Sequence, residues 1–578
     1  MITDHNWVEV IKDPKCQKNF ILKMRITGQE KYFATDTLSV MDVTSSYKTG
    51  TVTVTNLSKA LTFADSSLLG NVEGGDYFRI TSTANSPFYK IKVCSTNFTV
   101  TLIDYYKEAT GVGLRYEILT DFEIRKFLAG LFITAEISSS INLDTLSSVI
   151  SSISIGIDGK QRLQDIRATH VLSNMNAELG LIASGQTYQN RLQLGEGAIR
   201  KLSWGDDETP FKFSLVDLRK NLDRKFPSLK ITSENFSSSS GIGNSYPVLY
   251  GSVVESPCYY IGQVVTNYRW LVSGHDMNAI NTAYHDGASF NLTDEGTATD
   301  GDGNTYYYIE TDQNYTAQKV TISGNGVKNV DTYFSTAGEI IENIISNYSG
   351  LDSGQIDSAA FGTAKNKLGN WIISSIFNGY GTSEATAFDT IQKRLSPQLP
   401  IIPVWRNGKY GIIVIDLDNI VPICNLRMDK NIITRVGNIS ETDVSTVKNS
   451  FEINYGYNPR LQQTTKYKKL SSSNNKLLQL SKDKYGLLEA KAITSTDIQD
   501  DSTADRLLEF KAKLFSEVKL LVTYLCKPEA SIVEEGDFVT VTDSLQGWTN
   551  KYFICIGRKF TIDTVKLTLR EVRWEVLT

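Results

Sequence analysis

The sequence contains few of the residue types that catalytic and metal sites use most. Its 578 residues include four histidines and six cysteines, and the formal net charge is only −5. The near balance of 59 Lys+Arg against 64 Asp+Glu argues against a protein that binds nucleic acid by neutralising phosphates, and against a polybasic membrane-surface protein. With so few histidines, His-based catalysis has few candidates.

The cysteines are spread along the chain and form no CxxC pair. Several alternate with apolar residues inside strand-like runs, which predicts buried thiols rather than a disulfide framework or a zinc site. The N-terminus lacks the charged start and apolar core of a signal peptide, and no stretch reaches the roughly 18 apolar residues that a transmembrane helix needs. We therefore expect a soluble, multidomain chain made in a cytoplasm. The cysteines are Cys16, Cys94, Cys258, Cys424, Cys526 and Cys555.

The motifs of common enzyme families are also missing. The sequence has no HExxH, no G-x-S-x-G elbow, no Walker A loop and no GxGxxG after a strand. His275 and His285, each followed by an aspartate, are the only histidines close to one another in sequence, and both are predicted to be turn residues. Among the 64 carboxylates no acid/base pair can be selected. We predict no catalytic, cofactor-binding or metal-binding residues, and no cofactor.

Two local patterns have more than one interpretation. The acidic run 300–304 begins like a calcium loop, but Thr305 stands where an EF-hand needs Gly and Thr311 where it needs Glu. An exposed hairpin tip is favoured, and calcium binding stays open. The tyrosine-rich runs 258–261 and 306–308 could form a sugar- or partner-binding face, although filling of a sheet is favoured.

Short runs of alternating apolar and polar residues dominate the chain and predict a mainly β fold. A strand is expected at 20–27. Residues 48–118 are predicted to form a compact β unit of their own, in which Gly74, Gly75 and Asp76 supply a tight turn. Because Gly- and Thr-rich joints flank this unit, we interpret it as an inserted module.

Four stretches have the apolar spacing of helices. Residues 214–226 carry Leu215, Leu218 and Leu222 at helical spacing before Pro227. Residues 335–348 form the second stretch, with Thr336 and Glu339 placed as a capping box. The third and fourth are 383–395 and 502–515. A Ser-rich run at 237–240 is the best single domain boundary.

The C-terminal block is predicted to consist of strands after its helix. Within 565–576 the apolar residues change parity, which predicts a β-bulge near Arg570 and Glu571. The turn Gly536-Asp537 repeats Gly75-Asp76, and strands of similar pattern follow both turns. This echo indicates either a shared barrel-like plan or ordinary hairpin sequence, and the second interpretation is favoured.

These patterns together predict a mainly β, multidomain protein with a smaller α+β part and an inserted small β module. The expected parts are an N-terminal β region from 1–47 and 119–236, with the helix at 214–226; the module 48–118; a β domain 246–330; an α+β domain 331–420; and a C-terminal β domain 421–578.

Four sequence stretches occur in a suggestive order. They are Phe211 to Leu218 followed by Tyr246-Pro247-Val248-Leu249-Tyr250-Gly251; Thr336 to Ile341 with Gln355 to Phe361; Ala387 to Ile391 followed by Trp405 to Gly411; and the C-terminal helix followed by Val533 to Val541. In this order they resemble the central hub protein family of phage tail tips and baseplates. The module 48–118 is similar to a small β module of various phage structural proteins.

The resemblance implies a non-enzymatic virion protein at the distal end of a tail, made in the host cytoplasm. In that family a homotrimer closes the tail tube, and two tube-like β-barrels per chain give a pseudo-sixfold ring. The resemblance implies that these barrels are the N-terminal hub region 1–47 and 119–236 and the C-terminal hub domain 421–578. The implied partners are the distal tail protein ring, the tape-measure protein and a central fibre or tip protein. DNA would pass during genome ejection, and the host envelope is a further possible contact. The alternative is a host carbohydrate- or receptor-binding tail protein.

Overall fold

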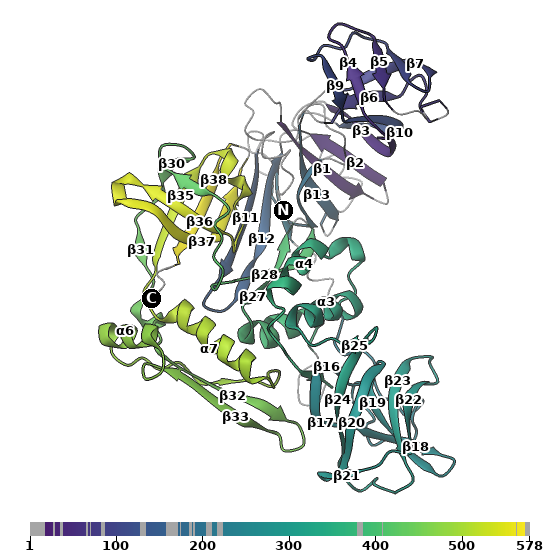
Figure 1. The fold of residues 1–578 in the computed structure, drawn as a ribbon, viewed down its shortest axis with the longest axis vertical. Helices are drawn as coiled ribbons and strands as arrows, with labels where there is room; N and C mark the ends of the chain where they lie inside the picture. Colours follow the sequence, from purple (N-terminus) through teal and green to yellow (C-terminus); the bar gives the residue numbers. More distant parts are fainter. Residues whose placement is uncertain are drawn as a thin grey trace.

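The computed structural model describes residues 18–26, 29–34, 38–64, 68–69, 71–81, 87–127, 134–157, 172–173, 175–183, 188, 191–203, 211–216, 224–378, 385–406, 408–561 and 563–572. Most of these residues lie in strands, and the chain is divided among several sheets, so the predicted mainly β, multidomain fold is confirmed. In Figure 1 a small β module lies at one end, a second β domain lies at the other, and a large sheet lies between them.

The large sheet contains 14 strands and is built from both ends of the chain. Its two halves join where β11 pairs with β37, from Ile137 opposite Phe560 to Ser140 opposite Gly557. Among the described residues the strand path from β2 to β30 is open. The N-terminal half contains β1 (Lys18–Ile26), β2 (Gln29–Ala34), β11 (Thr134–Asn142), β12 (Ser147–Ile157), β13 (Asn176–Ala183), β14 (Leu192–Ser203) and β15 (Phe211–Val216).

The C-terminal half carries the second part of this sheet. Its strands are β29 (Asn425–Arg427), β30 (Ile432–Arg435), β31 (Ser440–Glu441), β35 (Leu520–Cys526), β36 (Phe538–Asp543), β37 (Trp548–Phe560) and β38 (Val565–Glu571). The predicted bulge is not in β38, whose pairing with β35 is continuous from 565 to 570. The register shift lies in β37, between Cys555 and Gly557, so the bulge is on the partner strand.

The helix predicted at 214–226 is wrong at its start. Residues 214–216 belong to β15, where Phe213 and Leu215 alternate into the core and pair with Ile155 and Ile153 of β12. Pairing on both sides, with β12 and β14, outweighs the helical spacing of the leucines. Residues 217–223 lie outside the described residues, and 224–226 are not helical: Lys225 forms a β-bridge with Thr386.

The small module is an eight-stranded sheet with its own hydrophobic core. The core runs from Val52 to Ile118 and includes Phe63, Phe78 and Tyr116 in ring contact. The strands are β3 (Leu38–Tyr47), β4 (Val52–Val54), β5 (Ala60–Phe63), β6 (Tyr77–Ile80), β7 (Tyr89–Thr96), β8 (Thr99–Leu102), β9 (Gly111–Leu114) and β10 (Tyr116–Phe127).

The second β domain packs two sheets on a core around Trp270, Ile309 and Ile322. The first sheet contains β17 (Ser252–Pro257), β20 (Met277–His285), β21 (Ala288–Phe290), β24 (Val320–Asn329) and β25 (Thr332–Tyr333). The second sheet contains β18 (Tyr259–Val264), β19 (Asn267–Ser273), β22 (Asp294–Thr299) and β23 (Thr305–Thr311).

Helices gather in the middle of the molecule, next to short sheets. The predicted helix at 335–348 is α3 (Ala337–Tyr348), but the capping box does not form, because Thr336 bonds the Glu339 carboxylate instead of backbone. The helix predicted at 383–395 is a short α5 (Ala387–Asp389) continued by the π-helical η4 (Thr390–Leu395) and by η5 (Ser396–Gln398). The other elements are α4 (Ser358–Lys367), β16 (Val248–Tyr250), β26 (Ser375–Phe377), β27 (Ile401–Arg406) and β28 (Lys409–Val414).

A long hairpin and two helices complete the C-terminal half. The predicted helix at 502–515 is α7 (Asp501–Phe515), capped by Asp500, and it packs on the hairpin strand β32. The remaining elements are β32 (Ser450–Asn458), β33 (Gln463–Ser471), α6 (Lys476–Tyr485) and β34 (Ile493–Thr494).

Candidate functional site

A cleft of about 770 Å³ lies where three parts of the chain meet. One side is formed by strands β17 and β24 of the second β domain, another by α5, η4 and β26, and the third by the tip of the β32–β33 hairpin and the loop after β34. Its volume lies within the range of about 300–1,000 Å³ that is typical of ligand sites.

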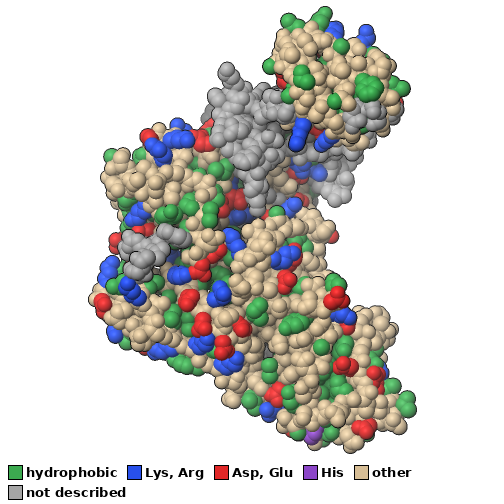
Figure 2. All heavy atoms as spheres, in the orientation of Figure 1, with side chains coloured by type: hydrophobic (Ala, Val, Ile, Leu, Met, Phe, Trp, Pro, Cys, Tyr) green, Lys and Arg blue, Asp and Glu red, His purple; other side chains and the backbone are tan. Residues whose placement is uncertain are grey.

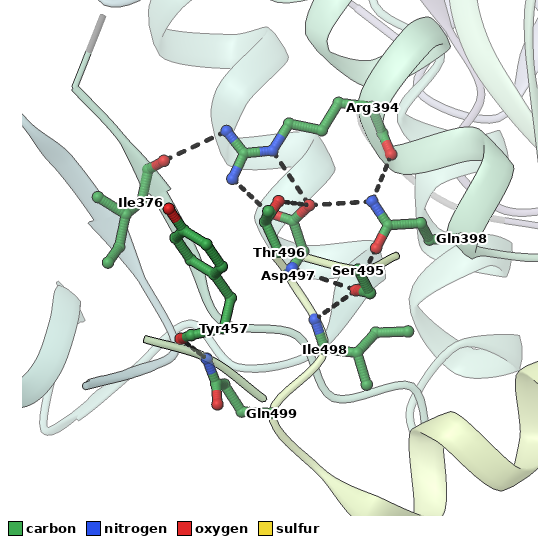
Figure 3. A network of polar contacts seen from close by, with 9 residues as sticks. All are labelled: Ile376, Arg394, Gln398, Tyr457, Ser495, Thr496, Asp497, Ile498 and Gln499. Atoms are coloured by element: carbon green, nitrogen blue, oxygen red, sulfur yellow. Dashed lines mark hydrogen bonds and ion pairs between the residues drawn. The ribbon is translucent and has the colours of Figure 1, made fainter. Parts of the chain in front are cut away.

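One wall of the cleft is held by a buried ion pair (Figure 3). The Asp497 carboxylate is 1% exposed and receives two bonds from the Arg394 guanidinium, Nε to Oδ2 at 3.0 Å and Nη2 to Oδ1 at 2.6 Å. Arg394 also donates from Nη1 to the carbonyl of Ile376 in β26. This bidentate geometry joins η4, β26 and the loop 495–499 into one unit.

Amide and hydroxyl groups complete this network. Gln398 donates to Asp497 Oδ2 at 3.0 Å and to the Arg394 carbonyl at 2.7 Å, and its oxygen accepts from the Ser495 hydroxyl. The same hydroxyl oxygen accepts from the backbone N–H groups of Asp497 and Ile498. The buried carboxylate is thus bonded by several donors, which makes this wall rigid.

The opposite side is closed by the hairpin tip. Glu255 of β17 is 8% exposed and accepts bonds from the side-chain amide of Asn458 and from Arg460 Nε, the latter at 2.9 Å. Gly287, in the β20–β21 turn, lies directly against the Arg460 guanidinium, and a Cβ there would approach Arg460 Cζ to 3.0 Å. The hairpin tip and the β domain are therefore tied together at the edge of the cleft.

Three hydrogen-bond donors on the lining remain unused within the described residues. Tyr457 directs its ring toward Ile376 and Arg394 (Figure 3), and its hydroxyl has no hydrogen-bond partner there. Lys319 is exposed and pairs with no described carboxylate. Arg460 uses only Nε on Glu255, which leaves both Nη groups for another acceptor.

A second cluster of buried charges lies at the joint of the large sheet. Arg406 of β27 contacts Glu534 at 3.0 Å and Glu535 at 3.3 Å, and Arg558 of β37 lies 3.7 Å from Glu534. The Ser139 hydroxyl of β11 donates to Glu535. This cluster therefore connects both halves of the sheet with the α+β part.

A more exposed ion pair also crosses the joint, and two carboxylates near it have shifted pKa values. Lys559 pairs with Glu136 at 2.8 Å across it. Burial raises the pKa of Glu534, but the charges of Arg406 and Arg558 outweigh it, and the pKa falls to about 2. Burial and the neighbouring carboxylates raise the pKa of Asp537 to about 6.

Of the two histidines singled out in the sequence, His275 lies in a bend, whereas His285 is the last residue of strand β20 and not a turn residue. His275 Nε2 accepts from the Leu249 N–H at 2.9 Å, and Nδ1 lies 2.9 Å from the Asp276 carbonyl. Burial lowers the pKa of His275 to about 4, so its ring is neutral at physiological pH. His285 stacks on Tyr315, with ring centroids 4.2 Å apart.

The acidic run 300–304 forms the turn between β22 and β23. The Asp300 carboxylate accepts from the N–H groups of Asp302 and Asn304, from the Tyr246 hydroxyl at 2.6 Å and from the Asn235 amide at 3.2 Å. Protein donors thus surround the oxygen atoms that a calcium ion would need. Among the described residues, no group of three or more His, Cys, Asp and Glu residues is arranged so that it could hold a metal ion.

The tyrosine-rich runs fill the second β domain, as the sheet-filling interpretation predicts. Tyr259, Tyr306 and Tyr307 are at most 8% exposed. Tyr260 packs edge-on against Trp270, and Tyr308 lies under the Arg269 guanidinium. These rings therefore belong to the core and its margin, and Tyr259 also reaches the lining of the cleft.

The described cysteines are free thiols. Burial raises the pKa of the Cys258 and Cys555 thiols above the ordinary value, which keeps both protonated at neutral pH. Within the part of the chain that the structure describes, no helix is both long and apolar enough to cross a membrane.

The residues of the cleft were not identifiable from the sequence. Arg394 and Asp497 are separated by 103 positions, and Glu255 and Arg460 by 205. No spacing rule connects charges at such separations. The only local signal is the apolar, Pro-ended stretch around Arg394, which predicts a helix and no partner.

Comparison with known proteins found similar solved structures. The tail protein from Neisseria meningitidis MC58 is 11% identical, with 78% of this chain and 94% of that chain covered and a TM-score of 0.35. The 43 kDa tail protein of prophage MuSo2 from Shewanella oneidensis is 9% identical, covering 78% and 96%, with a TM-score of 0.33. A chain in the virion of a native gene transfer agent particle is 8% identical, covering 58% and 86%, with a TM-score of 0.39.

No protein-family model matches the sequence, and no curated protein matches it. All three TM-scores lie below 0.5.

Proposed function

We propose that this chain is a structural, non-enzymatic protein of a phage tail: a hub of three copies at the distal end of the tail tube. The hub would close the tube, anchor a tip or central fibre, and open for passage of DNA. Its proposed neighbours are the distal tail protein ring and the tape-measure protein. The order of the four sequence stretches that resemble tail hubs supports this proposal.

The observation that carries the proposal is the large sheet built from two halves. Each half contributes strands from one end of the chain, and β11 and β37 join them edge to edge. Three chains with two sheet halves each would present six units around an axis. Such a ring suits a sixfold tail ring, because cyclic symmetry closes the contacts between copies.

Some strand edges are unsuitable for joining copies. At the outer edge of β29, the Asn431 side chain takes the place of a neighbouring strand: its oxygen accepts from the Arg427 N–H and its amide donates to the Asn425 carbonyl. The free strand β33 carries Lys466, Lys468 and Lys469. Blocked and lysine-rich edges discourage strand pairing. We therefore propose that copies meet through the N-terminal half or through side-chain faces.

The charge distribution fits a protein with many protein neighbours. On the face shown in Figure 2, cationic and anionic side chains are interspersed over the middle of the molecule, without a field of one sign. Such a surface offers specific pairing to proteins rather than general attraction to DNA.

The test combines mass measurement with location. Mass photometry of the purified full chain is expected to give a species of three times the 64.4 kDa chain mass. A tagged chain in assembled particles is expected at the distal tail end by gold labelling. Absence of the tag from purified particles would contradict the proposal. Specific binding of host saccharide by a chain that is monomeric in the particle would favour the receptor-binding alternative.

A further inference from the structure

We propose that the cleft between the second β domain, η4 and the β32–β33 hairpin binds an extended, acidic peptide segment of another protein. The inference is independent of the trimeric hub, because it follows from the groups that line the cleft. Four arguments support it: the charge of the lining, its unused donors, the character of its walls and its rigidity.

The lining has more cationic than anionic groups. Its charged residues are Lys319, Lys393, Arg394, Arg460 and Asp389. Arg394 is neutralised by the buried Asp497, and Lys393 pairs with Asp389 at 2.8 Å. Lys319 remains without a carboxylate in the described part of the chain. The charge of Arg460 is balanced by Glu255, which bonds Nε alone and leaves the Nη groups as donors. The net effect favours a ligand with negative charge.

Lys319 and Arg460 lie at the same edge of the cleft. The Lys319 N–H donates to the Asp286 side chain at 3.0 Å, and the next residue, Gly287, contacts the Arg460 guanidinium. A carboxylate between them would accept from an ammonium and from the free Nη groups. Charge-assisted bonds of this kind are stronger than neutral ones.

The walls suit a peptide better than a sugar. They include three prolines and four aromatic rings, together with side-chain amides able to bond a peptide backbone. A sugar would need acceptors for its hydroxyl protons, but among the described lining residues Asp389 is the single carboxylate, and it is already bound to Lys393. The groups are Pro227, Pro257, Pro459, Phe226, Tyr259, Phe377, Tyr457, Gln318, Gln462 and Gln499.

The cleft is preformed. The Arg394–Asp497 network holds one wall, and the bonds from Asn458 and Arg460 to Glu255 hold the other. A ligand would therefore not have to order these walls, and preorganisation of this kind raises affinity. The volume of about 770 Å³ has room for a short segment and excludes a folded domain.

The test uses the full chain and a fluorescein-labelled nonapeptide of alternating Glu and Pro with a central Tyr. Fluorescence anisotropy should show saturable binding in 50 mM salt that weakens in 500 mM salt. The same peptide with Lys in place of Glu should bind at least about tenfold more weakly. In parallel experiments, sulfated and phosphorylated oligosaccharides are added as competitors of the labelled peptide.

Two variants change the cleft without touching its buried network. Lys319→Glu, on an exposed side chain, is expected to weaken binding about tenfold, and Tyr457→Phe about threefold through loss of one hydroxyl. Lys482→Glu, on an exposed position of α6, is the matched control and should leave binding unchanged.

The proposal is overturned by any of three results. These are no saturable binding of the acidic peptide up to millimolar concentration, equal binding by the Lys peptide, or an affinity that Lys319→Glu leaves unchanged while circular dichroism shows an intact fold. Tighter binding of a charged oligosaccharide that depends on Lys319 would assign the cleft to a different ligand class.

Discussion

Two turns of nearly the same sequence, 73–76 in the small module and 534–537 in the C-terminal half, have the same backbone and different surroundings. In each, the Asp side chain accepts from the Glu N–H, at 2.8 Å in both Glu73–Asp76 and Glu534–Asp537. In each turn the N–H of the glycine before the Asp donates to a carbonyl in the second strand after the turn. Gly75 bonds Ile91 at 2.9 Å, and Gly536 bonds Cys555 at 2.8 Å.

The likeness continues beyond the turns. A register shift follows the bonded residue in both cases, between Ile91 and Val93 of β7 and between Cys555 and Gly557 of β37. The segments β6–β7–β8 and β36–β37–β38 thus share a three-strand plan. The similarity of the two segments therefore extends beyond the turn, further than the favoured interpretation of ordinary hairpin sequence predicts.

The surroundings separate the two turns. Burial raises the pKa of Asp76, and the residue that also affects it is Glu73 of the same turn. Asp537 lies beside Glu534, Glu535 and Arg406, where three parts of the chain meet. Local sequence thus determines the turn geometry, whereas long-range packing determines what a change in the turn costs.

The largest effect is expected from loss of the guanidinium at the second turn. Arg406→Met leaves Glu534 and Glu535 buried with less compensation, and should lower the free energy of unfolding by about 3–5 kcal/mol at neutral pH. The control is Arg79→Met in the strand after the first turn, because Glu117 would still hold Lys48 at 2.9 Å. Urea unfolding together with hydrogen exchange of β36 and β6 measures both losses. Equal losses would contradict the comparison.

The next effect concerns the glycines. Both have left-handed φ angles, +113° at Gly75 and +87° at Gly536. A Cβ on Gly75 has no heavy atom within 4 Å, whereas one on Gly536 would overlap Ile413 Cγ2. Gly75→Ala should therefore cost about 1 kcal/mol of backbone strain, and Gly536→Ala about 3 kcal/mol with overpacking. Thermal unfolding of both variants checks whether Gly536→Ala is the less stable of the two. Equal losses would contradict the comparison of the turns.

The smallest effect is a pH dependence. Since the folded-state pKa of Asp537 is raised from 3.8 to about 6, the folded protein binds this proton more tightly than the unfolded chain. The ionised carboxylate is therefore destabilising above pH 6, and stability should rise as the pH falls from 8 to 5. Asp537→Asn should raise the unfolding free energy by about 1–2 kcal/mol at pH 8 and by little at pH 5.

The control for the pH effect is Asp76→Asn, for which the same direction and a smaller size are expected. Both amides keep an oxygen for the Glu N–H of the turn. Melting temperatures from pH 5 to 8 measure the effect. A wild-type melting temperature that is flat across this range, or a less stable Asp537→Asn at pH 8, would refute the assignment.

Much of the secondary structure could be predicted from the sequence. The apolar spacing of α3 and α7 and the alternation in β1 locate these elements within two residues of their observed ends. Their signals are local, because one face of each packs on the core. Leu215 fails as a helix residue because its strand partners, Ile153 and Ile199, lie far away along the chain.

The candidate cleft could not be predicted. Its wall depends on Arg394 meeting Asp497, and its edge on Glu255 meeting Arg460, and neither pair has a sequence signal. The same limit on prediction applies to the turns. Gly536 and Asp537 are recognisable as a turn, but the contact with Arg406 depends on how β27 packs against the C-terminal half.

One strand, β37, is shared by three neighbours: it pairs with β36 along its first part, with β11 along its last part and with β38 on its other edge. A pull that slides the two halves of the sheet past one another would load the β11–β37 hydrogen bonds in shear, so that they must break together. Resistance to such a pull is therefore concentrated at Gly557–Phe560, while the pairings with β36 and β38 keep β37 fixed in its own half.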